Sequence, residues 1–150
     1  VMPITLPSDV EALRRAVQRT KARFVVIDPL SAFLSGNIDS YKDADIRRAL
    51  HPLKILAEET GAAVVVVRHL NKTRGGSAIY RGGGSIGITG AARSVLLVAK
   101  DLSEPERHVI ASVKSNLGPP PEALAFHLEA SEGTHVAHCG FRSISYTGSG

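Results

Sequence analysis

The residues best suited to chemistry in this chain are an aspartate and a histidine, each of which follows a short apolar run. Asp28 ends the run at 24–27 and precedes Pro29, and His69 closely follows the run at 62–67. Such runs without polar alternation are typical of strands buried on both faces of a parallel sheet. Open α/β sheets bind ligands at the carboxyl edge of their strands, where a carboxylate can hold a hydrated Mg²⁺ beside nucleotide phosphates. The alternative is a core strand whose Asp28 only opens a turn before Pro29.

Two helical patterns must bring these runs together. A short strand at residues 2–6 precedes an amphipathic helix, which starts at Ser8 or Asp9 and continues to about residue 20. A second helix, starting at Ser40 or Asp43, stops at Gly61. The succession of strand, helix and strand predicts a right-handed βαβ unit, which places the aspartate and the histidine along one sheet edge.

The second half of the chain has a different pattern. A glycine-rich loop at residues 70–84 leads to a short helix at 85–92. The strands expected after it are at 94–99, 109–114, 123–129 and 135–146, separated by turn residues. The fold class expected is α/β, with a mostly parallel sheet flanked by helices and a carboxyl-terminal antiparallel β-meander. Residues 1–150 would form a single domain, with a flexible tail at 147–150.

Positive charge is concentrated in one stretch. The chain has a formal net charge of +4, and residues 61–100 contain no Asp or Glu. Within this stretch, Lys72, Arg74 and Arg81 fall in or beside the glycine-rich loop. A basic block suggests a polyanion partner such as nucleic acid, although a solvated surface or a plain connector would have the same composition.

Composition also bounds where the protein works. The single cysteine, Cys139, cannot form an internal disulfide, which fits a reducing cytoplasm. No apolar run is long enough to span a bilayer, so no membrane association is expected. The opening Val1-Met2-Pro3 suggests a piece of a longer protein.

Four segments, taken in order, carry a resemblance to a known family. They are Phe24-Val25-Val26-Ile27-Asp28, His69-Leu70-Asn71-Lys72, the stretch from Arg81 to Arg93, and Lys114-Ser115-Asn116-Leu117-Gly118-Pro119 followed by Phe126. Over roughly residues 2–130 the chain resembles the RecA-like core of hexameric helicases, the DnaB group. It is more similar still to the RepA-type plasmid and phage replication ATPases. In this comparison the first segment looks like a Walker B strand.

The resemblance implies a role for each segment, with ATP and Mg²⁺ as cofactors. Asp28 would hold Mg²⁺ through water, and His69 would contact the γ-phosphate. Lys114 would reach the nucleotide of a neighbouring subunit and stabilise charge in the transition state. The subunits would form a ring, which the resemblance implies is a hexamer. Residues 70–84 would face the central channel, where Lys72, Arg74 and Arg81 would follow the phosphates of single-stranded DNA.

The sequence departs from the family pattern in two places. Asn116 stands where the family often has an arginine, so Lys114 would act alone, or Arg107 or Arg142 would substitute. No G-x-x-x-x-G-K-[ST] occurs, and the resemblance places that P-loop and the catalytic glutamate upstream of residue 1. This chain alone is therefore not expected to hydrolyse ATP. Two alternatives stay open: a non-catalytic module that binds nucleic acid or oligomerises, and another α/β enzyme that binds a small anion at the same edge.

Overall fold

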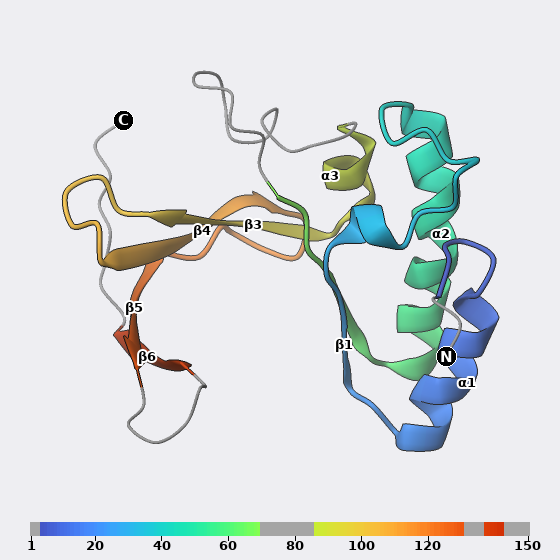
Figure 1. Ribbon diagram of the computed structural model, residues 1–150, viewed down its shortest axis with the longest axis horizontal. Coiled ribbons are helices and arrows are strands. Elements are labelled where there is room, and N and C mark those ends of the chain that lie inside the picture. The colour runs from blue at the N-terminus through green and yellow to red at the C-terminus, as the bar shows by residue number, and fades with distance from the viewer. Residues whose placement is uncertain (1–3, 70–85, 131–136, 143–150) are drawn as a thin grey trace. The chain divides into compact units, whose positions relative to one another are not determined.

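The computed structural model of the protein describes residues 4–69, 86–130 and 137–142 (Figure 1). The backbone contacts divide the chain into two compact units, Val1–Ala91 and Ala92–Gly150. Each unit is described by itself below. A single domain over residues 1–150 stays a prediction, and the expected tail at 147–150 lies outside the described residues.

Two long helices and two short strands form most of the first unit. Its elements are α1 (Val10–Thr20), β1 (Phe24–Ile27), the 3₁₀ helix η1 (Leu30–Ala32), α2 (Asp43–Thr60), β2 (Ala63–Val66) and α3 (Gly87–Ala91). The first two expected helices are confirmed with their starting points, and the short helix expected at 85–92 is observed at Gly87–Ala91. The expected stop is confirmed as well: Gly61 ends α2 in the left-handed conformation, with φ of 67°, which glycine adopts without steric cost.

The parallel pair β1–β2 is confirmed, but burial of both its faces is not. The strands pair from Phe24 opposite Ala63 to Ile27 opposite Val66. Alternate residues point to opposite sides, so Ile27 and Val66 pack in the core formed with α1 and α2. On the other side, Phe24 is 61% exposed and Val26 51%. The prediction of burial on both faces was wrong for this chain, because an apolar run shows that a strand can be covered, not that anything covers it.

The core of this unit is built mainly from one stripe of α2. Ile46, Leu53 and Leu56 recur at helical spacing and are buried, and they share one core cluster with Leu6 and with Leu30 of η1. This packing makes α2 the element against which the strands are positioned.

The strand expected at residues 2–6 is reduced to a single bridge in the part of the chain that the structure describes. Leu6 forms an isolated parallel bridge with Leu34, and its N–H donates to the carbonyl of Phe33 at 2.6 Å. Residues 1–3 lie outside the described ranges.

The second unit is the expected antiparallel meander. Its strands are β3 (Ser94–Lys100), β4 (Arg107–Ser115), β5 (Leu124–Ala130) and β6 (Ala137–Arg142), paired in that order. Among the described strands only β1 and β2 pair in parallel, so the expectation of a mostly parallel sheet holds for the first unit alone. Taken together, the described residues form a mixed α/β structure with a parallel pair of strands and an antiparallel sheet.

None of the helices within residues 4–69 and 86–130 has the length and apolar character needed to cross a bilayer.

Candidate functional site

Backbone hydrogen bonds join the two chain segments just beyond the ends of β1 and β2, where Asp28 and His69 lie. The N–H of Val67 donates to the carbonyl of Ile27 at 2.8 Å, and the N–H of Leu30 donates to the carbonyl of Val67 at 2.8 Å. Asp28 therefore follows the end of one strand directly, and His69 stands two residues beyond Val67 on the other. Both residues are exposed, at the carboxyl edge of the same parallel pair, as the sequence predicts.

The side chain of Asp28 has no structural task within the described residues. An aspartate that opens a turn would accept a hydrogen bond from the N–H two residues on. That donor, the N–H of Leu30, is instead bound to Val67. The geometry therefore does not support the turn-forming alternative and leaves a carboxylate exposed to solvent at the sheet edge.

A carboxylate in this position fits one way of binding Mg²⁺. No group of three or more potential metal ligands occurs among the residues that the structure describes. Mg²⁺ is commonly held by one or two carboxylates, with water and phosphate oxygens completing the shell. Asp28 suits that arrangement, whereas a site made wholly of protein ligands would need more donors.

An arginine that sequence reasoning did not single out links the same edge to α3. Arg68 directly precedes His69, is half-buried, and its Nη2 donates to Oγ1 of Thr89 at 3.4 Å. Thr89 is itself buried. Burial lowers the pKa of the Arg68 guanidinium. The sequence signal for Arg68 is its place after an apolar run, but its partner lies 21 residues away.

The start of α3 is held by α2. Oδ1 of Asp43, in the first turn of α2, accepts a hydrogen bond from the N–H of Gly87 at 3.0 Å. A methyl group placed on Gly90 would lie 3.1 Å from Nη2 of Arg47, so the end of the Arg47 side chain reaches this glycine. Within the first unit, α3 is thus held to α2 by the Asp43 hydrogen bond, and the end of the Arg47 side chain lies beside it.

The structure places Lys114 in the second unit. It lies in β4 opposite Val95, is half-buried, and its Nζ donates to the carbonyl of Ala92 at 2.7 Å. Nearby, the N–H of Asn116 donates to the carbonyl of Arg93 at 2.9 Å. Lys114 therefore contacts its own unit, and its role in a neighbouring subunit stays a prediction.

The remaining predicted site residues fall in a part of the chain about which the structure gives no information. Lys72, Arg74 and Arg81 lie outside the described residues. Their role in binding nucleic acid stays a prediction from the sequence.

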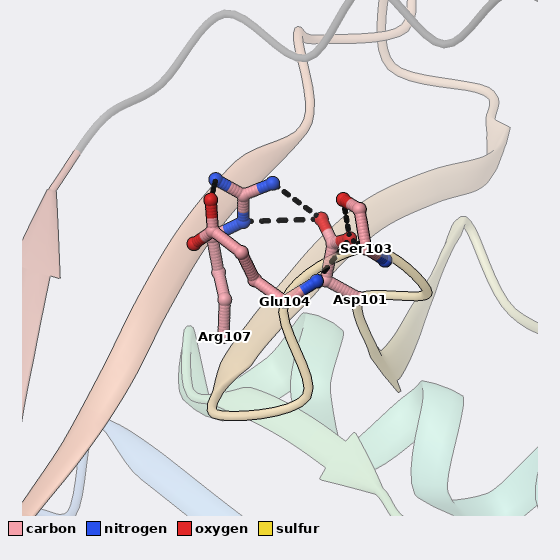
Figure 2. A network of polar contacts seen from close by, with 4 residues as sticks. All are labelled: Asp101, Ser103, Glu104 and Arg107. Carbon is pink, nitrogen blue, oxygen red and sulfur yellow. Dashed lines mark hydrogen bonds and ion pairs between the residues drawn. The ribbon is translucent and has the colours of Figure 1, made fainter.

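A network of polar contacts closes the hairpin between β3 and β4 (Figure 2). Oδ1 of Asp101 accepts from the N–H and the hydroxyl of Ser103 at 2.7 and 2.6 Å, and Oδ2 accepts from Nη2 of Arg107 at 2.8 Å. Nη1 of Arg107 also pairs with Glu104 at 3.0 Å. The bonds from Ser103, and then from Arg107, hold the pKa of the Asp101 carboxyl well below its usual range.

This network bears on one alternative for the trans-acting arginine. The side chain of Arg107 is only 17% exposed and is bound to two carboxylates of its own hairpin. The contacts therefore argue against Arg107 as the substitute for the missing arginine. Arg142 is the last residue of β6.

Comparison with protein-family models gives a match over the first half of the chain. A family model described as "AAA domain" matches residues 1–75, which include β1, Asp28, α2, β2 and His69. No curated protein matches the chain.

Proposed function

The chain belongs to the AAA domain family, whose model matches residues 1–75 of its 150, and we propose that it is part of a RecA-like, ring-forming ATPase acting on single-stranded DNA. Membership of this family indicates an AAA-type, ATPase-related function. The finer assignment, to the RepA- and DnaB-type replicative motors with ATP and Mg²⁺ as cofactors, is our proposal.

One observation carries it. Asp28 and His69 follow adjacent parallel strands at one edge, and the N–H that would occupy Asp28 in a turn is bound to Val67 instead. A carboxylate and an imidazole at such an edge match the position where open α/β sheets bind nucleotides.

Each residue then has a distinct task. Asp28 would hold Mg²⁺ and so help to orient the phosphates, and His69 would donate a hydrogen bond to the terminal phosphate. Bound Mg²⁺ supplies neutralisation of the charge that develops during phosphoryl transfer. Lys114 serves a neighbouring subunit only after its Nζ leaves the carbonyl of Ala92. Lys72, Arg74 and Arg81 contact the single strand.

The test uses nuclear magnetic resonance on the 150-residue chain. Addition of ATP with Mg²⁺ should shift the backbone signals of residues 27–30 and 67–69, and ATP with a chelator should shift them less. Asp28→Asn should abolish the difference between the two titrations. Asp39→Asn, a change of the same kind at another exposed aspartate, should preserve it. Shifts confined to other parts of the chain would rule out this edge as the nucleotide site.

The sequence supports a second candidate, because it contains no G-x-x-x-x-G-K-[ST] motif. In that case the chain is a non-catalytic module that binds nucleic acid or oligomerises, and Asp28 and His69 bind no nucleotide. Binding of single-stranded DNA without any Mg²⁺-dependent shift at Asp28 would favour this module over the motor.

A further inference from the structure

Arg68 lies between the histidine proposed to contact phosphate and a buried hydroxyl of α3. It directly precedes His69, which is exposed at the carboxyl edge of the strand pair. The side chain of Arg68 is half-buried, and its Nη2 donates to Oγ1 of Thr89 at 3.4 Å. One residue earlier, the N–H of Val67 donates to the carbonyl of Ile27 at 2.8 Å. The segment that leads into His69 is therefore held to β1 at one residue and to α3 at the next.

The helix α3 is too short to be stable by itself, so its packing depends on contacts with other elements. Its five residues, Gly87–Ala91, include two glycines, and glycine is the weakest helix former after proline. It lies beside the first half of α2 (Figure 1). Contacts hold it at three places: to α2 through Asp43, to the core through Ile88, and to the end of β2 through Arg68. The packing of α3 is therefore a local equilibrium that the loss of a single contact can shift.

This equilibrium bears on His69 through Arg68. While α3 is packed, the hydrogen bond to Thr89 fixes the residue that directly precedes the imidazole. When α3 opens, Arg68 loses this hydrogen bond, and a ligand must then order His69 as it binds, which lowers its affinity. We propose that Arg68 is a positioning residue that couples His69 to α3: packed α3 orients the imidazole, and a ligand bound to His69 stabilises α3 in turn. The second effect follows from the first, because coupling between two sites is reciprocal.

The inference rests on the proposed function only for the identity of the ligand, a nucleotide phosphate. The orientation of His69 by α3 is a property of the chain without ligand, and it is measured in that state. Failure of nucleotide binding and failure of the coupling are therefore separate results.

The first experiment compares two substitutions of Thr89 in the ligand-free chain by nuclear magnetic resonance. Thr89→Val removes the hydroxyl but keeps a branched side chain, whereas Thr89→Ser keeps the hydroxyl. In Thr89→Val the backbone order parameter of His69 should fall by about 0.2, towards the range of flexible backbone. Exchange of the N–H of Gly90 should accelerate by about 2- to 10-fold, as expected for the loss of one neutral hydrogen bond. Thr89→Ser should keep both values close to those of the unchanged protein.

The matched control removes a threonine hydroxyl elsewhere in the same unit. The hydroxyl of Thr20 donates to the carbonyl of Ala16 in α1 at 2.8 Å, and Thr20→Val removes this hydrogen bond. This variant should change neither the order parameter of His69 nor exchange in α3. An equal loss of order at His69 in Thr20→Val and Thr89→Val would overturn the coupling, because the effect would then be a general loosening of the unit.

A change on the opposite side of α3 tests whether the helix itself carries the effect. Asp43→Ala removes the carboxylate that accepts from the N–H of Gly87, and it leaves both Arg68 and Thr89 in place. It should nevertheless lower the order parameter of His69. An unchanged His69 in this variant, despite faster exchange in α3, would overturn the coupling, and so would an unchanged His69 in Thr89→Val.

Addition of ATP with Mg²⁺ tests the reciprocal effect. In the unchanged protein, saturating ATP should shift the signals of His69 and slow exchange of the Gly90 N–H by about 2- to 10-fold. Thr89→Val should abolish this slowing, and Thr89→Ser should retain it. Slowing that persists in full in Thr89→Val would overturn Arg68 as the link. Absence of any ATP-induced shift would overturn the proposed function, and the ligand-free measurements would then decide the coupling.

Discussion

The hydrogen bond between Asp43 and Gly87 leads to a prediction about how readily α3 opens. Asp43→Ala removes the carboxylate that accepts the first N–H of that helix at 3.0 Å. A hydrogen bond to a charged group contributes roughly 1.5–3 kcal/mol, and the lower end applies here because Asp43 is only half-buried. A loss of about 1.5 kcal/mol corresponds to a roughly tenfold increase in local opening of α3.

Amide hydrogen exchange measured by nuclear magnetic resonance reads this opening directly. The probes are the N–H of Gly87 and the N–H of Gly90, which donates to the carbonyl of Ile86 at 2.8 Å. Both should exchange about tenfold faster in Asp43→Ala than in the unchanged protein. Opening of this kind is local, so the exchange rates of the core amides of α2 should change far less.

The control for this experiment lies in the same helical turn. Asp45 also lies in the first turn of α2, where its negative charge interacts favourably with the helix dipole. Its carboxylate accepts hydrogen bonds from Arg48 and from the N–H of Asp39, not from α3. Asp45→Ala should destabilise the start of α2 without accelerating exchange in α3. Equal acceleration of Gly87 and Gly90 in both variants would refute the reasoning, because the effect would then come from α2 as a whole.

Two further predictions concern stability. The lowered pKa of Asp101 means that its stabilising contribution is present above the ordinary carboxyl pKa of 3.8 and is lost as the pH falls below it. Chemical denaturation should show Asp101→Asn less stable than the unchanged protein at pH 7 and converging with it towards pH 2, and a difference independent of pH would contradict this. Gly61→Ala should lower the free energy of unfolding by about 1 kcal/mol, because its φ of 67° strains any residue with a Cβ. Gly36→Ala is the control, since a Cβ there meets no atom within 4 Å and the φ is not in the left-handed region, so little loss is expected.

The helix ends and strands that depend only on neighbouring residues could be predicted from the sequence. The start of α2 at Asp43 and its end at Gly61 were both expected from the residue types at its ends. The apolar runs predicted β1 and β2, and the position of Asp28 followed from the rule that parallel strands end at one edge. Each of these inferences needs only neighbouring residues and one rule of topology.

The contacts that complete the site could not be predicted, because their partners are distant in the chain. Arg68 meets Thr89 across 21 residues, and Asp43 meets Gly87 across 44. No spacing rule joins such pairs, since their proximity depends on how α3 packs against α2. The Asp101 network was missed for a different reason. Turn residues were expected between these strands, but turn propensity does not show which carboxylate will accept hydrogen bonds from the N–H groups of the turn.

The uncovered side of the β1–β2 pair affects how the purified protein will behave. The apolar side chains of Phe24, Val26 and Val65 are exposed to water there. Among the described strands, β1 and β2 pair only with each other. Surfaces of this kind favour self-association and attract chaperones and hydrophobic dyes. The purified protein should therefore aggregate most readily at high concentration, and an additive that covers this side of the strand pair should slow the aggregation.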